Sequence, residues 1–390
     1  MDPNELFDTR AIVKEVYDFF QVNEDFSNLP RKYKMSISAN LQNASNAEIN
    51  CISFTPAVKK IEGELKKGFH IKLGGGLSSR PFLAQTLDVF IEPERTLEIA
   101  TAITAIYRDH GYREKRHHSR LKFLVADWGV EKFLEKITEY TGPLHSKGEE
   151  PVQAWNAGYF YGIHDQVQEG LKFLGFNVPV GRLDAEEMFE LAKISNKYGN
   201  GEIRTCNSQN LIIPNVPEAN VETLLKEPIF ERISINPNAF VGHAVPCTGN
   251  EYCNLALVET KALMLKTAKE LDKRISLDVP VRIHMIGCPN SCGQRQIADI
   301  GLQGVLLRNQ EKEMVEAFEI YVGGTLNAGG KFNEKLKGRI PADQLLPVLE
   351  KLLAQFKAEK KPGENYFDFV NRLGIPTLQD VYDGILEQVS

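Results

Sequence analysis

Long hydrophobic runs are missing from this chain of 390 residues. No window approaches the roughly 18 uninterrupted apolar residues that a membrane-spanning helix needs. The first residues, M-D-P-N-E-L-F-D, are acidic and lack the apolar core of a secretory signal. We therefore expect a protein without a membrane span or an export signal, located in the cytoplasm.

An excess of positive charge is missing too, because 46 Lys and Arg face 52 Asp and Glu, which gives a net charge of -6. This balance argues against general affinity for nucleic acid or anionic membranes. Binding of an anionic ligand must therefore depend on a local cluster of basic residues. The length predicts two or three domains, each able to bury its own core.

Cysteine is scarce, with six residues in the whole chain. In a reducing compartment, so few cysteines fit metal or redox chemistry better than a disulfide framework. Cys51 and Cys206 are isolated, and we expect them in the core. The other four form two close pairs, in P-C-T-G-N-E-Y-C at 246 to 253 and in G-C-P-N-S-C-G at 287 to 293.

The two pairs predict a metal site, because thiolates brought together from two loops can converge on one centre. Glycines in both loops allow close backbone approach and let N–H groups point at sulfur. Two alternatives stay open from the residues alone. Four structural core cysteines are one, although core cysteines are seldom paired in Gly- and Pro-rich loops. Structural zinc is the other, although the gap between Cys247 and Cys253 is longer than zinc sites favour.

The chain also contains an internal repeat, with a shift of about 248 residues. G-F-H-I-K-L-G-G-G-L at 68 to 77 is similar to A-F-E-I-Y-V-G-G-T-L at 317 to 326. About the same shift pairs 49 to 54 with 297 to 302, Leu29 with Leu277, and the helical pattern at 94 to 107 with that at 342 to 355. We infer an ancient duplication.

Between the copies, P-L-H-S-K-G-E-E-P at 143 to 151 has the composition of a linker. Asp184 and Glu187 then predict a capping box and a helix to about Tyr198, and two short strands follow in E-I-R-T-C and N-L-I-I-P. This order predicts a small α+β half-domain. The expected domains are residues 1–145, 150–232 and 233–390.

The repeat is asymmetric, because far fewer residues precede Leu29 than separate the linker from Leu277. Roughly 100 residues of a first copy have no counterpart here. We therefore expect the chain to begin in the middle of its own repeat.

The residues around the cysteines resemble a known family. C-T-G-N-E-Y-C-N-L-A-L-V-E-T-K followed by G-C-P-N-S-C-G-Q is similar to the signature of the assimilatory nitrite and sulfite reductases, which hold a 4Fe-4S cluster bridged to a sirohaem. Residues 28 to 34, 180 to 192 and 201 to 216 resemble further family blocks. The resemblance implies an α+β fold, duplicated about a pseudo-twofold axis, with ferredoxin-like half-domains of which the first is missing here.

The resemblance also implies a site and a reaction. All four cysteines, Cys247, Cys253, Cys288 and Cys292, would ligate the cluster, and Cys292 would bridge it to the sirohaem iron. Single electrons would then reach an iron whose other face is open for substrate. The implied reaction is the six-electron reduction of sulfite to sulfide or of nitrite to ammonia. We find no nucleotide or flavin fingerprint, which fits a reductase fed by a separate carrier such as ferredoxin.

Lys32 and Lys34 are the candidate residues for the anion. If an alternating strand begins here, both side chains project to the same side, opposite to Tyr33 and Met35. A solvated charged strand would show the same pattern. The resemblance places both lysines in the substrate pocket, where they would hold the anion and help to deliver protons. At position 34, nitrite reductases of this family tend to carry Asn and sulfite reductases Lys, so Lys34 leans towards sulfite.

A basic cluster occupies residues 113 to 122, R-E-K-R-H-H-S-R-L-K. Sirohaem carries several carboxylates, and Arg116, Arg120 and Lys122 are candidates to bind them. An exposed charged helix face is the alternative. The two histidines of the cluster are not expected to bind haem iron, because the axial thiolate would come from Cys292.

Gly74 to Gly76 lack the spacing of a phosphate loop and recur in the second copy as Gly323 and Gly324, so we expect a structural turn.

Family members carry an upstream half-domain that supplies arginines to substrate and sirohaem, and no position here matches those arginines. Two hypotheses follow from this difference. The chain is a portion of a reductase, or works with a separately encoded first half. Alternatively, it is a non-catalytic iron-sulphur or electron-transfer protein.

Overall fold

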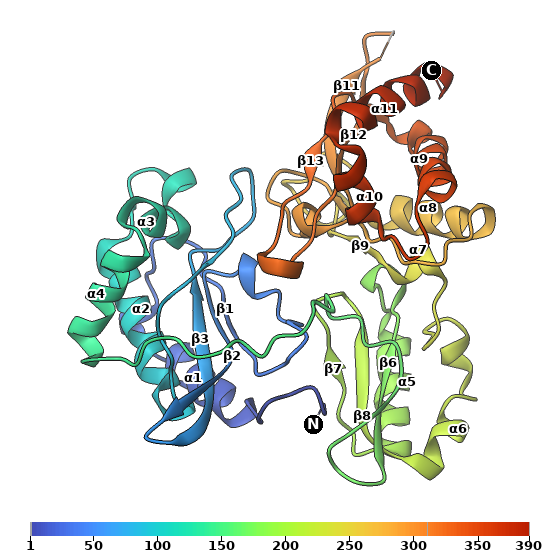
Figure 1. The fold of residues 1–390 in the computed structure, drawn as a ribbon. Coiled ribbons are helices and arrows are strands. Elements are labelled where there is room, and N and C mark those ends of the chain that lie inside the picture. Colours follow the sequence, from blue (N-terminus) through green and yellow to red (C-terminus); the bar gives the residue numbers. More distant parts are fainter. Residues whose placement is uncertain (1, 310, 390) are drawn as a thin grey trace. The chain divides into compact units, whose positions relative to one another are not determined.

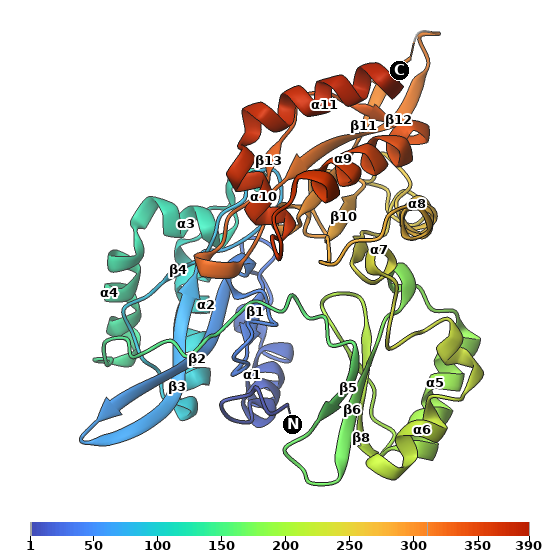
Figure 2. The ribbon, with the colours of Figure 1, turned by 45° about the vertical axis from the view of Figure 1, so that its right-hand side comes forward.

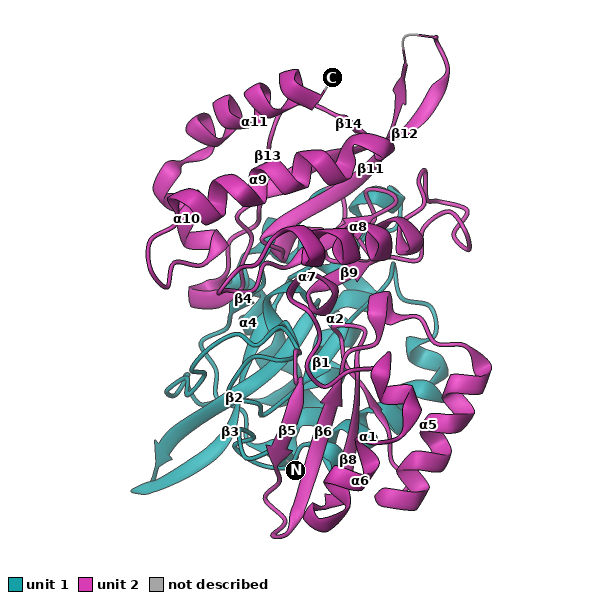
Figure 3. Cartoon of the chain, turned by 90° about the vertical axis from the view of Figure 1, so that its right-hand side faces the viewer, with its two compact units in different colours: residues 1–76, 80–158 teal, residues 77–79, 159–390 magenta. Residues whose placement is uncertain are grey.

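The fold is described from a computed structural model that covers residues 2–309 and 311–389. The chain forms two compact units (Figure 3). Unit 1 comprises residues 1–76 and 80–158, and unit 2 comprises residues 77–79 and 159–390. In the described ranges, no helix has both the length and the apolar character needed to cross a membrane.

Unit 1 is a four-stranded sheet with helices packed against it, in the strand order β1-β2-β3-β4 (Figure 1). β1 runs parallel to β2, whereas β3 is antiparallel to both of its neighbours. All four helices contribute side chains to one core with β2 and β3. The elements are α1 (Arg10–Gln21), β1 (Met35–Ile37), β2 (Ile52–Ile61), β3 (Glu64–Leu73), β4 (Gln85–Thr86), α2 (Thr96–His110), α3 (Leu121–Trp128) and α4 (Val130–Thr141).

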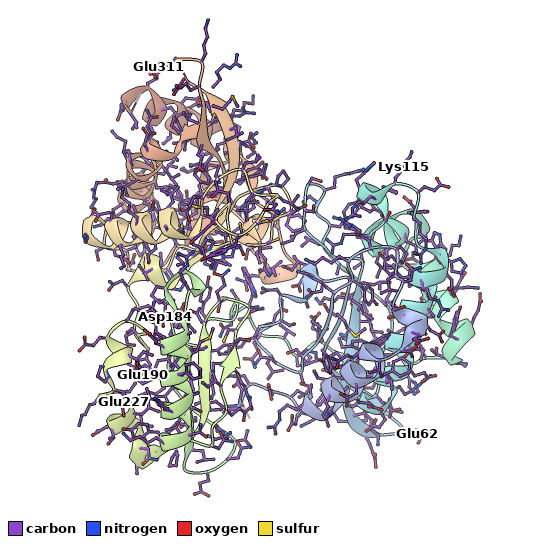
Figure 4. The ribbon with its side chains drawn as sticks, turned by 180° about the vertical axis from the view of Figure 1, so that it is seen from behind. Glu62, Lys115, Asp184, Glu190, Glu227 and Glu311 are labelled. Atoms are coloured by element: carbon purple, nitrogen blue, oxygen red, sulfur yellow. The ribbon has the colours of Figure 1, made fainter. Side chains whose placement is uncertain are left out.

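Unit 2 begins with an antiparallel sheet in the order β5-β6-β8-β7, and α5 and α6 lie on one side of it (Figure 2). The side chain of Asp184 accepts a hydrogen bond from the Glu187 amide, and the Glu187 carboxylate accepts one from the Asp184 amide. Figure 4 labels Asp184 at this end of α5. The predicted half-domain, capping box and hairpin are therefore confirmed. The elements are β5 (Gly162–Asp165), β6 (Leu171–Phe176), α5 (Ala185–Tyr198), β7 (Arg204–Thr205), β8 (Leu211–Pro217) and α6 (Val221–Leu224).

The rest of unit 2 is built on a second sheet, in the order β13-β12-β11-β10-β9, with β14 paired to β12. β9, β10 and β11 are parallel, and β12 is antiparallel to β11. The elements are α7 (Ala239–Gly242), β9 (Ala244–Pro246), α8 (Lys261–Arg274), β10 (Ile283–Ile286), β11 (Ile300–Arg308), β12 (Met314–Val322), β13 (Glu334–Lys335), β14 (Ile340–Pro341), α9 (Leu345–Glu359), α10 (Tyr366–Leu373) and α11 (Ile375–Val389).

The predicted duplication is visible in the order of elements. β10 to β13 repeat the pairing of β1 to β4, and α8 to α11 stand at the same places in the order as α1 to α4. The glycine turn recurs as well, with φ of +84° at Gly74 and +81° at Gly323. A Cβ added at Gly75 would lie 2.4 Å from the Glu48 carbonyl oxygen, and one at Gly324 would lie 2.6 Å from that of Ala298. The glycines therefore serve a structural turn, as predicted.

Two predicted boundaries are wrong. The strand expected from Tyr33 begins at Met35, because the Lys34 carbonyl accepts hydrogen bonds from two successive amides, those of Cys51 and Ile52. The sequence between the two cysteine pairs predicts a helix from about Asn254 to Ile275, but the helix begins at Lys261, because the preceding residues form a loop held by backbone hydrogen bonds. The domain limits 1–145, 150–232 and 233–390 stay a prediction.

Candidate metal centre and anion site

The four paired cysteines lie at the ends of two neighbouring parallel strands. Cys247 directly follows β9, and Cys288 follows β10 after one glycine. The Cys247 amide donates to the Met285 carbonyl at 2.8 Å and so extends the pairing of the two strands. Parallel neighbours end at the same edge of a sheet, which brings the two loops together.

The thiols of these cysteines are close enough to influence one another. Burial raises the pKa of Cys288, a hydrogen bond from the Asn290 amide opposes this rise, and the other three thiols raise the pKa further. Negative charge on the Cys288 sulfur is therefore unfavourable until a cation shares it. A bound metal cluster supplies that positive charge.

Backbone and hydroxyl groups are arranged around Cys247. The Gly287 amide donates to the Cys247 sulfur at 3.1 Å, as expected for small residues near a metal site. A Cβ added at Gly287 would lie 2.7 Å from the Ala256 Cβ, so a larger residue would push the two loops apart. Thr260 donates its hydroxyl to the Cys247 carbonyl at 2.7 Å. These contacts hold the first sulfur in place.

Over the described residues, no three His, Cys, Asp or Glu side chains converge closely enough to hold a single metal ion. A four-iron cluster takes one thiolate at each iron, so its ligands stand further apart than those of one zinc ion.

Burial excludes the alternative of four structural core cysteines. Cys247, Cys253 and Cys288 are half-buried, and Cys292 is exposed. Thiols that only stabilise a core would be shielded from solvent.

The isolated cysteines differ in burial. Cys51 is completely buried, as expected. Cys206 is half-buried, and desolvation raises its pKa to about 12.

Lys32 and Lys34 belong to unit 1, immediately before β1. Lys32 is exposed and Lys34 is half-buried. The ring of Tyr33, between the two lysines, stacks on that of Tyr107 at 5.5 Å between centroids. Ser36 follows Lys34 by two residues, and its hydroxyl donates a hydrogen bond to the Ser53 hydroxyl at 2.8 Å.

The second repeat carries Arg282 at the position equivalent to Lys34. Its guanidinium donates to both carboxylate oxygens of Asp299, at 2.9 and 2.8 Å. The side chains of this pair are 14% and 7% exposed, so the positive charge is neutralised inside the protein. The first-repeat counterpart of Asp299 is Cys51, a thiol in place of the carboxylate.

The three basic candidates differ in environment. Arg116 is exposed. Arg120 is half-buried, and one of its terminal nitrogens lies 3.4 Å from the Cys51 sulfur. Lys122 is buried, and its ammonium lies 3.4 Å from the Gly76 carbonyl and also contacts that of Arg80. Desolvation lowers the pKa of Lys122 to about 8.

His284 was not predicted as a site residue. Its position in β10, only four residues before Cys288, was the signal that could have identified it. Its Nδ1 lies 3.2 Å from the Gln294 carbonyl, to which it donates, and its buried Nε2 has no hydrogen-bond partner. Burial, followed by the positive charge of Arg282, lowers the pKa of His284 to about 4. The ring is therefore neutral and holds the loop that carries Cys292.

We expect this histidine to make stability depend on pH. Because its pKa falls from an ordinary 6.5 to about 4 on folding, the unfolded chain binds the extra proton first. Its contribution is full above pH 6.5 and is lost as the pH falls towards 4. Between about pH 8 and pH 5, the loss is roughly 2 kcal/mol of unfolding free energy.

Urea unfolding at both pH values measures this effect. In His284→Gln the pH-dependent loss should shrink, whereas His117→Gln, at an exposed histidine, should keep it in full. Equal pH dependence in all three proteins would refute the assignment.

Comparison with family models gives two matches. A model described as "Nitrite and sulphite reductase 4Fe-4S domain" matches residues 1–143 and 239–388. A second, described as "Nitrite/Sulfite reductase ferredoxin-like half domain", matches residues 164–230. Together they account for most of the chain.

Individual proteins show the same similarity. The chain is 40% identical to a ferredoxin--nitrite reductase of Synechococcus elongatus, over 91% of this chain and 70% of that protein. It is 36% identical to the chloroplastic ferredoxin--nitrite reductase of Zea mays, over 91% of this chain and 64% of that protein. The solved structure of the Mycobacterium tuberculosis NirA protein superposes with a TM-score of 0.89 at 30% identity, over 97% of this chain and 69% of the other. The chain thus spans about two thirds of the length of these relatives.

Proposed function

Because the chain belongs to the nitrite and sulfite reductase family, we propose that it serves the six-electron reduction of a small oxyanion, nitrite to ammonia or sulfite to sulfide. The observation that carries this proposal is the approach of four thiols at the ends of β9 and β10, where the other three raise the pKa of Cys288. The family's cofactors are a 4Fe-4S cluster and sirohaem.

We assign Cys247, Cys253, Cys288 and Cys292 to the cluster. The exposure of Cys292 supports its assignment as the thiolate shared with sirohaem. When bound, the two groups would supply single-electron transfer and an iron position open to substrate. The Gly287 amide, directed at the Cys247 sulfur, would stabilise negative charge on that ligand.

Lys32 and Lys34 are assigned to the anion. Their ammonium groups would attract it and donate protons to its departing oxygens. In the second repeat the equivalent cation, Arg282, is paired with Asp299.

Arg116, Arg120 and Lys122 remain the proposed partners of the sirohaem carboxylates. Arg116 is exposed and could bind a carboxylate directly. Lys122 would first have to exchange its contacts with backbone carbonyls.

The names of the relatives favour ferredoxin as the electron donor and nitrite as the substrate. We propose the cytoplasm as the location, although the maize relative is named chloroplastic. The assay for the proposal is turnover of nitrite and of sulfite by the cofactor-loaded chain with reduced ferredoxin. Turnover of either anion supports it. A loaded chain that accepts electrons but turns over neither anion would instead be the non-catalytic electron-transfer protein.

Lys34 is proposed to shift preference towards sulfite, and Lys34→Asn tests this. Removing one ammonium should weaken the hold on the doubly charged sulfite more than on the singly charged nitrite. We expect the ratio of kcat/KM for sulfite to that for nitrite to fall about tenfold. Lys115→Asn, at an exposed lysine of the same unit (Figure 4), is the matched control. An unchanged ratio in Lys34→Asn would remove this residue from substrate selection.

A further inference from the structure

The loop of residues 250–259 carries Cys253 between β9 and α8. Its two ends are joined by the Asn250 amide, which donates to the Val258 carbonyl at 3.1 Å. Val258 is completely buried, and a Cβ added at Gly304 of β11 would lie 2.2 Å from one of its side-chain carbons. Most other residues of the loop are exposed. The position of the Cys253 thiol therefore depends on how the two ends of the loop are held.

The carboxylate of Glu316 binds both ends of this loop. Glu316 lies in β12, which pairs along its length with β11 (Figure 2). One carboxylate oxygen accepts a hydrogen bond from the Asn250 side-chain amide at 2.9 Å, and the other accepts one from the Glu259 backbone amide at 3.1 Å. Because Glu316 is half-buried, these charge-assisted hydrogen bonds are partly shielded from water. One side chain of a distant strand thus closes the loop.

The first repeat shows that the strand itself does not need this carboxylate. Lys67 of β3 is the counterpart of Glu316, because residues 68–77 correspond to residues 317–326. β3 pairs with β2 at this position all the same. The Lys67 ammonium donates instead to the Leu6 carbonyl at 3.1 Å. The carboxylate is therefore a feature of the repeat that carries the paired cysteines, and not of the strand pairing that both repeats share.

The same loop also contacts the second cysteine pair. The Leu257 amide donates to the Gly287 carbonyl at 2.8 Å. The Gly287 amide donates in turn to the Cys247 sulfur at 3.1 Å, and Cys288 follows Gly287 directly. A shift at the base of the loop would therefore disturb the backbone that lies between two other sulfurs.

We propose that Glu316 is a positioning residue for the metal centre. Its carboxylate holds the two ends of the 250–259 loop together and thereby keeps Cys253 beside the other three paired cysteines. The proposal rests on the proposed function, because Glu316 has this role only if Cys253 is a cluster ligand.

The test exchanges donor and acceptor between two side chains. In Glu316→Gln, one of the two acceptor oxygens becomes a donor, so one hydrogen bond is lost. In Asn250→Asp, two carboxylates face each other. The double variant restores both hydrogen bonds, because the glutamine donates to the aspartate and accepts from the Glu259 amide. The three variants and the wild-type chain are loaded with cofactors and purified anaerobically.

Two readouts report on the loop without relying on turnover. The first is the rate at which an added iron chelator bleaches the iron-sulphur absorbance. This rate should rise about tenfold in each single variant and return close to the wild-type rate in the double variant, because loss of one hydrogen bond to a charged group favours opening of the loop. The second is hydrogen exchange in the loaded chain, where the amides of residues 250–259 should exchange faster in the single variants only.

Glu313→Gln is the matched control, because it removes an exposed carboxylate just before β12. It should keep the wild-type rate of iron loss, and circular dichroism checks the folding of every variant. Equal rates in the wild-type chain and both single variants, or a double variant no slower than the single variants, would overturn the proposal while the proposed function stands. A wild-type chain that takes up no cluster would refute the proposed function, and the role of Glu316 with it.

Discussion

Replacing Cys288 with serine is expected to abolish the iron-sulphur cluster and, with it, the reductase activity. Cys288 is the thiol whose pKa responds to all three of the others, which places it among them. Serine cannot supply a thiolate, and a cluster held by three cysteines is poorly retained. We expect bound iron to fall from about five atoms per chain, four in the cluster and one in the sirohaem, to about one or fewer. Turnover of nitrite or sulfite should fall more than about a hundredfold. Iron and acid-labile sulfide analysis of anaerobically purified protein measures the loss.

Cys206→Ser is the matched control for this substitution. Cys206 is a single half-buried thiol in the half-domain, away from the four paired cysteines in sequence. Its replacement should leave iron content and turnover unchanged. If Cys288→Ser keeps its full complement of iron, the four-cysteine assignment is wrong.

Replacing Lys32 with alanine is expected to lower kcat/KM for both anions about a hundredfold, the usual cost of removing one donor aimed at developing negative charge. Lys32 is exposed and lies shortly before β1. The loss should appear largely in kcat, because a proton donor acts on the departing oxygens more than on the bound anion. Steady-state kinetics with both anions separates the two parameters.

Two controls accompany Lys32→Ala. Lys115→Ala removes an exposed lysine elsewhere in unit 1 and should leave both parameters unchanged. Lys32→Arg keeps the charge but is a poorer proton donor, so it should restore KM more than kcat. If Lys32→Ala behaves like Lys115→Ala, Lys32 is only a solvated surface residue.

Much of the fold could be predicted because its signals are local. The capping box at Asp184 depends on side chains three residues apart, and the glycine turns at Gly74 and Gly323 depend on a backbone that other residues seldom adopt. The duplication was visible because both copies keep the same apolar spacing. The cysteine pairs were visible because a cluster needs thiols in loops that glycine allows to approach closely.

Predictions failed where distant backbone contacts decide. The alternation of residue types predicted a strand from Tyr33. The strand begins at Met35 instead, because the Lys34 carbonyl accepts hydrogen bonds from two successive amides, those of Cys51 and Ile52. His284 reads as an ordinary strand residue until its burial is known. Cys206 was expected in the core but is only half-buried. Its burial depends on the residues that surround it in the fold and not on its being a cysteine.

The sequence by itself determined the family and the repeat and predicted four sulfur ligands, because these depend on residue type and spacing along the chain. Only the tertiary structure decided that Arg282 is neutralised by Asp299, since this pair joins the starts of the neighbouring strands β10 and β11. It also decided that, among the described residues, one edge of β1 pairs with no strand and lies beside an apolar groove. Whether the edge of a strand is paired depends on segments that are distant in the sequence, so no local sequence pattern predicts it.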